Sequence, residues 1–179
     1  MIEVRGVVEG RSWPGPPGIM AGMTEQPARV LFVCHGNICR SAMAERVAIA
    51  AFADAGIDAE IWSAGVSDEE HGNPMDFRAQ RLMKKRGYSF AGHRAHQVSR
   101  AEIDRADLVL AFEPYHIRSM LRIAPDATNL RLITDFIPGA AAGSSVDDPW
   151  YGGEREFVIT LEAIEAAMPE IVNEFRPRR

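Results

Sequence analysis

The chain has 179 residues, 46% of them apolar and 25% charged, and its 20 basic and 25 acidic residues leave a net charge of −5. This composition is typical of one globular domain with a sizeable core. The acidic balance argues against nucleic acid or an anionic membrane as a main partner, and no apolar run approaches the ~18 residues that a membrane helix requires.

The first 27 residues differ in composition from the rest of the chain. Prolines and glycines crowd the run from Gly10 to Gly18, which excludes a helix or a central strand there. We expect residues 1–27 to be a flexible extension and residues 28–179 to form the domain. A wrongly assigned start, with translation beginning at Met20 or Met23, is the alternative explanation.

Beyond residue 28, short apolar runs alternate with longer segments of helical periodicity. We expect strands at 29–33, 60–63, 108–111 and 130–133. We expect helices at 41–53, 74–86, 114–123 and 154–175, a short helical turn around 102–103, and an irregular stretch at 134–153. The alternation predicts a single-domain α/β fold, in which a four-stranded parallel sheet carries helices on both faces.

The first expected strand leads directly into Cys34, which is followed by five residues, Arg40 and Ser41. Gly36 and Asn37 tolerate the left-handed backbone that turns successive N–H groups inward. We expect Ser41 to cap the next helix, whose N-terminus favours an anion. The sequence therefore predicts a phosphate-binding loop after the first strand, at the carboxyl edge where parallel sheets place their sites.

The same loop has the parts of a nucleophilic site. Arg40 can bind phosphate oxygens with its guanidinium fork, and a helix N-terminus beside a cation favours the thiolate of Cys34. By itself a Cys-x5-Arg spacing is weak evidence, because an inert buried thiol explains it as well. The strand before the loop and the helix after it favour the chemical role. Since the N-terminus lacks the pattern of a secretory signal, we expect a cytoplasmic protein with reduced cysteines.

An acid for the leaving oxygen is expected in the late irregular stretch. Asp147 and Asp148 precede Pro149, and Trp150 and Tyr151 follow as aromatic side chains that could flank a planar substrate ring. A solvated acidic turn is the alternative, since Asp-Pro commonly begins turns. Together with the cysteine loop, the pair indicates an acid–nucleophile site.

These residues resemble the low-molecular-weight protein tyrosine phosphatases from about Arg29 to Phe175. The signature is the 13-residue run from Val33 to Glu45, VCHGNICRSAMAE. The supporting matches are Ser63-Ala64-Gly65, Asn73-Pro74 with Asp76, His93-Arg94-Ala95 and Asp148-Pro149.

The resemblance implies a role for each catalytic residue. Cys34 would form a phosphocysteine and Arg40 would bind the phosphate. Asp148, which directly precedes the proline as the family's acid does, would protonate the leaving phenol and then activate water. Ser41 would hydrogen-bond the sulfur and ease its departure.

It also implies a supporting scaffold. Asn37 would be held in a strained turn by Ser41, Ser63 and His93, although an ordinary histidine at the edge of a helix is the alternative for His93. The other phosphate-binding or supporting positions are His35, Gly36, Ile38 and Cys39. Neither a metal nor a cofactor is implied, and the histidines show no zinc-like spacing. The implied partner is a phosphotyrosine protein, and weak self-association is left open.

Several positions depart from the family's pattern. Ala42 replaces the usual proline after Arg-Ser, and His35 is unusual after the nucleophile. Glu69, in an acidic segment where the family often has an aromatic residue, would form the substrate wall with Trp150 and Tyr151. The resemblance allows Cys39 either a reversible disulfide with Cys34, which protects the thiolate, or the role of a small apolar residue.

Three other functions are alternatives to protein-tyrosine phosphatase. An arsenate reductase of this fold is disfavoured, because the chain has no relay cysteine after Cys39. A protein-arginine phosphatase is a close alternative, but related enzymes of that kind tend to carry a small threonine where this chain has Ile38. A non-catalytic phosphate-binding module is disfavoured by the intact set of Cys34, Arg40 and Asp148.

Overall fold

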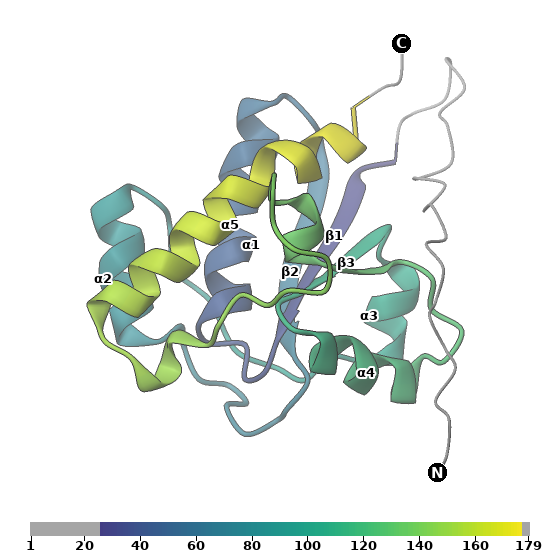
Figure 1. Cartoon of the computed structure of the whole chain (residues 1–179), viewed down its shortest axis with the longest axis horizontal. Coiled ribbons are helices and arrows are strands. Elements are labelled where there is room, and N and C mark those ends of the chain that lie inside the picture. The colour runs from purple at the N-terminus through teal and green to yellow at the C-terminus, as the bar shows by residue number, and fades with distance from the viewer. Residues whose placement is uncertain (1–25, 177–179) are drawn as a thin grey trace.

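The structure, a computed structural model, describes residues 26–176 (Figure 1). The expected flexible extension over residues 1–27 therefore lies almost wholly outside the described residues, and so do residues 177–179. Within the described range, no helix is long and apolar enough to cross a membrane.

Four strands form one parallel sheet in the order β2-β1-β3-β4. Their bounds are β1 Ala28–Cys34, β2 Ala59–Gly65, β3 Leu108–Ala111 and β4 Leu130–Leu132. The predicted α/β fold with a four-stranded parallel sheet is confirmed. β1 is central, and its last residue, Cys34, pairs with Gly65 of β2, so the loops that follow both strands lie at one edge of the sheet.

Helices cover both faces of the sheet (Figure 1). α1 (Arg40–Asp54), α2 (Phe77–Arg86) and α5 (Glu154–Glu174) pack on one face, and α3 (Arg100–Arg105) and α4 (Pro114–Ile123) on the other. Side chains of the central strand point alternately to the two faces of the sheet. Val30 and Phe32 pack in the hydrophobic cluster on the side of α1, α2 and α5, and Leu31 and Val33 in the cluster on the side of α3 and α4. All four are completely buried, and each such side chain contributes about 1.5–3 kcal/mol to folding.

The structure corrects the expected starts of two helices. α1 begins at Arg40, and its N-cap is Cys39, not Ser41, whose hydroxyl bonds neighbouring side chains instead. α2 begins at Phe77, three residues later than expected, because the Asp76 carboxylate accepts the Arg78 N–H and ends the extended backbone before it. Both differences arise from side-chain hydrogen bonds that periodicity does not reveal.

The expected irregular stretch contains two short 3-10 turns. The first is η1 (Ile133–Phe136), which begins at Ile133, so β4 ends one residue earlier than expected. The second, η2 (Pro149–Tyr151), has Asp148 as its N-cap, with the Asp148 side chain accepting the Trp150 N–H at 3.1 Å. The candidate acid is therefore held at the start of an ordered turn.

Candidate active site

The loop of residues 35–39 joins the end of β1 to the start of α1. Its backbone is bonded to the segment after β2, where Val66 N–H donates to the Cys34 carbonyl at 2.9 Å and Ser67 N–H to the His35 carbonyl at 3.0 Å. Gly65 allows this approach, because a Cβ there would lie 2.6 Å from the His35 carbonyl oxygen. The loop is thus fixed against the neighbouring strand.

Asn37 holds the loop in its curved form. It is completely buried and has φ of 59°, in the left-handed region that residues other than glycine rarely adopt. Its side-chain amide donates to the hydroxyls of Ser41 at 3.0 Å and Ser63 at 2.9 Å. Its carbonyl groups accept from His93 Nε2 at 2.6 Å and from the His96 N–H at 3.2 Å. Four partners therefore stabilise an unfavourable backbone conformation.

Glu45, in the second turn of α1, contacts two of the residues that hold Asn37. Its carboxylate accepts the Ser63 hydroxyl at 2.5 Å and lies 4.0 Å from His93 Nδ1. Burial lowers the pKa of His93, so its ring is neutral at pH 7 and donates through Nε2 to Asn37. Glu45 closes the sequence signature, but a role for it was not predicted from the residues.

The Cys34 sulfur is buried and lies 3.0 Å from the Ser41 hydroxyl oxygen. Because that oxygen already accepts the Asn37 amide hydrogen, its own hydrogen is free to point at the sulfur. The sulfur therefore lies beside a hydroxyl donor and near the N-terminus of a 15-residue helix. Cys39, in contrast, is a buried free thiol whose pKa is raised by burial.

Arg40 lies beneath the loop with only 1% of its surface exposed. Its Nη1 donates to the Val146 carbonyl at 3.0 Å and pairs with the Glu113 carboxylate, while Nη2 donates to Asp148 Oδ2 at 2.6 Å. Burial opposes the charge, but the Cys34 sulfur and the two carboxylates raise the pKa of the guanidinium above its ordinary value. The guanidinium therefore stays protonated, and its hydrogen bonds join the cysteine loop to the loop that carries Asp148.

Glu113 is the partner of Arg40 that the sequence reasoning missed. It lies two residues after the end of β3, and functional side chains in parallel sheets lie at the carboxyl ends of the strands. Its position in the sequence could therefore have marked it as a candidate. Both candidate acids are in exposed positions, and of the two it is Asp148 that contacts Arg40.

The remaining predicted residues lie at the rim of the site. His35 Nε2 lies 3.3 Å from Glu69 Oε2, and the His35 and Tyr115 ring centroids are 6.3 Å apart. Trp150 is 42% and Tyr151 95% exposed. Ile38, in contrast, is 8% exposed and packs in the main core cluster.

Tyr115 is a rim residue that was not predicted. Burial and the nearby Glu113 carboxylate raise the pKa of its phenol to about 12. Its hydroxyl group is therefore neutral at pH 7 and is available as a hydrogen-bond donor.

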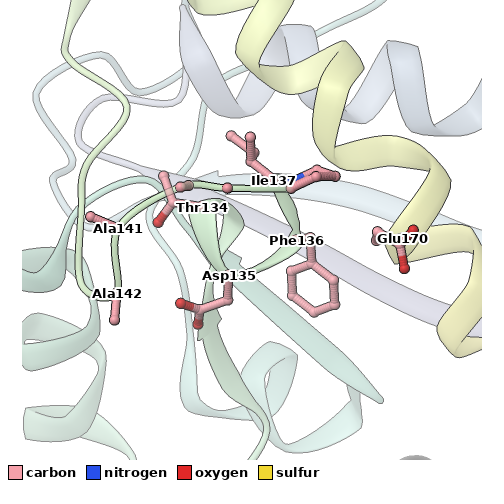
Figure 2. A pocket seen from close by; sticks show the side chains of 10 residues that line it. Thr134, Asp135, Phe136, Ile137, Ala141, Ala142 and Glu170 are labelled. Carbon is pink, nitrogen blue, oxygen red and sulfur yellow. The ribbon is translucent and has the colours of Figure 1, made fainter.

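A separate cavity of about 550 Å³ lies between η1, the segment after it and α5 (Figure 2). Residues 134–142 and Glu170 line it, and no predicted site residue does. Within residues 26–176, no group of three or more His, Cys, Asp or Glu side chains is placed to hold a metal. The groups that lie around Cys34 are a hydroxyl, a guanidinium and two carboxylates.

Comparison with known proteins finds the same family along nearly the whole described chain. The family model for low molecular weight phosphotyrosine protein phosphatase matches residues 29–178. A relative from Streptomyces coelicolor, named low molecular weight protein-tyrosine-phosphatase, is 41% identical over 145 residues, which are 78% of this chain and 88% of the relative.

Solved structures agree. The low molecular weight protein tyrosine phosphatase from T. tengcongensis is 33% identical with a TM-score of 0.76, over 83% of this chain and 99% of that one. Vibrio vulnificus Wzb, solved in complex with benzylphosphonate, is 27% identical with a TM-score of 0.75, over 84% of this chain and 100% of that one. The chain belongs to the low molecular weight phosphotyrosine protein phosphatase family.

Proposed function

We propose that this phosphatase hydrolyses phosphotyrosine in proteins through a phosphocysteine on Cys34, with Asp148 as the general acid. The observation that carries the proposal is the contact of Arg40 with Asp148 at 2.6 Å, made by an arginine whose other neighbours include the Cys34 sulfur. This contact supports a site in which Cys34, Arg40 and Asp148 act together, although 108 residues separate Arg40 from Asp148.

In the first step, the Cys34 thiolate attacks phosphorus as the bond from phosphorus to the phenolic oxygen breaks. Asp148 gives its proton to that oxygen, so the leaving group departs as a neutral phenol. The N–H groups of the loop and the guanidinium of Arg40 stabilise the charge on the equatorial oxygens, which is where positioning and electrostatics supply most of the catalysis.

In the second step, Asp148, now a carboxylate, takes a proton from water as the water oxygen attacks phosphorus and the sulfur–phosphorus bond breaks. Inorganic phosphate and the Cys34 thiolate result. The Ser41 hydroxyl, 3.0 Å from the sulfur, stabilises the departing thiolate by a hydrogen bond. No oxidant, metal or cofactor takes part in either step.

The rim supports an aromatic ester as substrate. Trp150 and Tyr151 follow the Asp148-Pro149 pair and are exposed, so they are available to flank a planar ring. The ligand in the complex of Vibrio vulnificus Wzb, benzylphosphonate, also carries an aromatic ring, although it is a phosphonate and not an ester. The two buried, unpaired cysteines support a reducing, cytoplasmic location.

The test compares three substrates and three proteins. Hydrolysis of an aryl phosphate, a phosphotyrosine peptide and a phosphoarginine peptide is measured for the wild type, Cys34→Ser and Asp148→Ala. We expect no turnover in Cys34→Ser and a loss of about 100-fold or more for the phosphotyrosine peptide in Asp148→Ala. Full activity in Cys34→Ser would contradict the mechanism, and a preference for phosphoarginine would contradict the substrate assignment.

A further inference from the structure

Arg78, in the first turn of α2, connects two parts of the site. Its Nε and Nη2 donate to the two carboxylate oxygens of Asp76, each at 3.0 Å. Its Nη1 donates to the carbonyl oxygens of Trp150 and Gly152, at 3.0 and 2.9 Å. One guanidinium therefore binds both the N-cap of α2 and the η2 turn that follows Asp148.

Aromatic rings fix the plane of this guanidinium. The Arg78 Cζ atom lies 4.7 Å from the centroid of the Phe157 ring, 5.4 Å from that of Trp150 and 5.7 Å from that of Phe77. Its side chain is 23% exposed, which makes it partly desolvated. A planar fork stacked on rings and bonded to four acceptor atoms is rigid, and a lysine could not reproduce it.

The contacts form a continuous path between the two loops of the site. Asp76 N–H donates to the carbonyl of Ile38, in the phosphate-binding loop, at 2.8 Å, and the Asp76 side chain is only 5% exposed. At the other end, Asp148 accepts the Trp150 N–H at 3.1 Å. Arg78 is a second link between the two loops, beside Arg40, and it acts on the turn that follows Asp148.

We propose that Arg78 is a positioning residue for proton transfer by Asp148. Its fork holds η2 where Asp148 reaches the leaving oxygen, at the moment when the sulfur–phosphorus bond forms and the bond to the phenolic oxygen breaks. The proposal rests on the proposed function, in which Asp148 is the acid. Without Arg78, η2 and the adjacent Gly152 lose two hydrogen bonds to their carbonyl oxygens. Among the described residues, Arg40 and the Trp150 N–H then remain as the partners of the Asp148 side chain.

The dependence on leaving group separates this role from a general structural one. A misplaced acid harms esters of basic phenols, which need the proton, far more than esters of acidic phenols, which depart without it. The measurement is kcat/KM, which reports the phosphorylation step, for a series of aryl phosphates from p-nitrophenyl phosphate to phenyl phosphate. The protein is the full chain, and thermal unfolding is measured for each variant.

For Arg78→Met, which keeps an apolar stem against the rings, we expect a loss of about 10–100-fold on phenyl phosphate and less than about 3-fold on p-nitrophenyl phosphate. Arg78→Lys keeps the charge without the fork, and we expect it to show most of the same selective loss. The matched control is Arg81→Met: Arg81 is exposed on the same helix and has no hydrogen bond or ion pair with any residue that the structure describes.

Each outcome decides the proposal. An equal loss on every substrate would make Arg78 a merely structural residue, and a full recovery in Arg78→Lys would assign the effect to charge; either result overturns the positioning role. Asp148→Ala, measured in parallel, shows how steeply kcat/KM depends on the leaving group in an enzyme that lacks its acid. If that variant shows no leaving-group dependence, the proposed function itself fails, whereas a steep Asp148→Ala with an unchanged Arg78→Met refutes only the role of Arg78.

Discussion

The phosphate-binding loop and the rim of the site are built in opposite ways. Asn37 and Ser41 are completely buried and bonded to several partners, whereas the Glu69 side chain is 75% and Tyr151 95% exposed. Buried, mutually bonded groups hold one geometry, which the transfer of a phosphoryl group requires. Exposed side chains can change without unfolding the protein, so the rim is where substrate preference can vary within one chemistry.

The sharpest test of this contrast is Asn37→Ala. We expect kcat/KM to fall about 100-fold, equivalent to about 2.7 kcal/mol, on good and poor leaving groups alike, because the whole cradle loses its shape. The measurement is kcat/KM for p-nitrophenyl phosphate and phenyl phosphate. Asn37→Gly is the control that relieves the backbone at φ of 59° while removing the same hydrogen bonds. Wild-type activity in Asn37→Gly would show that the side-chain contacts do not hold the loop.

The next effect concerns the charge beneath the loop. We expect Glu113→Ala to lower the free energy of unfolding by about 2 kcal/mol, since it removes a charged hydrogen-bond partner from a buried guanidinium. Glu113→Gln keeps an acceptor of nearly the same shape and should lose less. Urea denaturation at pH 7 measures both, and equal stability of Glu113→Ala and the wild type would show that Asp148 and Val146 suffice for Arg40.

A pH effect follows from His116, which is completely buried at the start of α4. Burial, together with Arg40 and His35, lowers the pKa of its ring to about 3. An unfolded histidine has a pKa of about 6.5, so protons favour the unfolded chain between these values. We expect the free energy of unfolding to be fully present above pH 6.5 and to fall by up to about 1.4 kcal/mol per pH unit toward pH 3.

Urea denaturation between pH 7 and pH 4 measures this slope. The slope should be shallower in His116→Gln, whose amide can still accept the Glu113 N–H that His116 Nδ1 accepts at 3.1 Å. His71→Gln, at an exposed site, is the matched control. Identical slopes in His116→Gln and the wild type would assign the acid sensitivity to other groups.

The smallest effect is expected at the rim. Glu69→Gln removes a charge beside His35, so kcat/KM should fall a few-fold for phosphotyrosine peptides with flanking lysines and rise for those with flanking glutamates. Raising the salt concentration should reduce both changes. The rate on phenyl phosphate, which has no flanking residues, serves as the control. A large change on that ester would make Glu69 part of the chemistry, contrary to the contrast between loop and rim.

Much of the fold followed from local pattern. The strand at 108–111 and the helix at 114–123 have the predicted bounds, because apolar runs, helical periodicity and Pro114 in the first turn mark them directly. The start of α2 was wrong by three residues, since Asp76 caps it through a side-chain bond. Ser41 was misjudged as a cap because the partners that take its hydroxyl, Asn37 and Cys34, meet it only in the folded loop.

The candidate site also has a part that local sequence predicts and a part that it does not. Cys34, Arg40 and Ser41 lie within eight residues, so their proximity is a property of the chain. The place of Glu113 after a strand marks it as a candidate, but its pairing with Arg40, 73 residues away, was not predictable. The bonds of Arg78 to Trp150 and Gly152 were not predictable either. Spacing carries no information about them, because they depend on which loops the sheet order brings together.

The strand–loop–helix unit around Cys34 and Arg40 is predictable from local sequence, since hydrophobic periodicity and backbone preference act over a few residues. The carboxylates that hold Arg40, and the way Arg78 joins the two loops, depend instead on long-range folding. The physical reason is that the parallel order β2-β1-β3-β4 gathers the carboxyl ends of strands far apart in the chain at one edge. Burial at that edge strengthens the electrostatic interaction between each charged group and its partner.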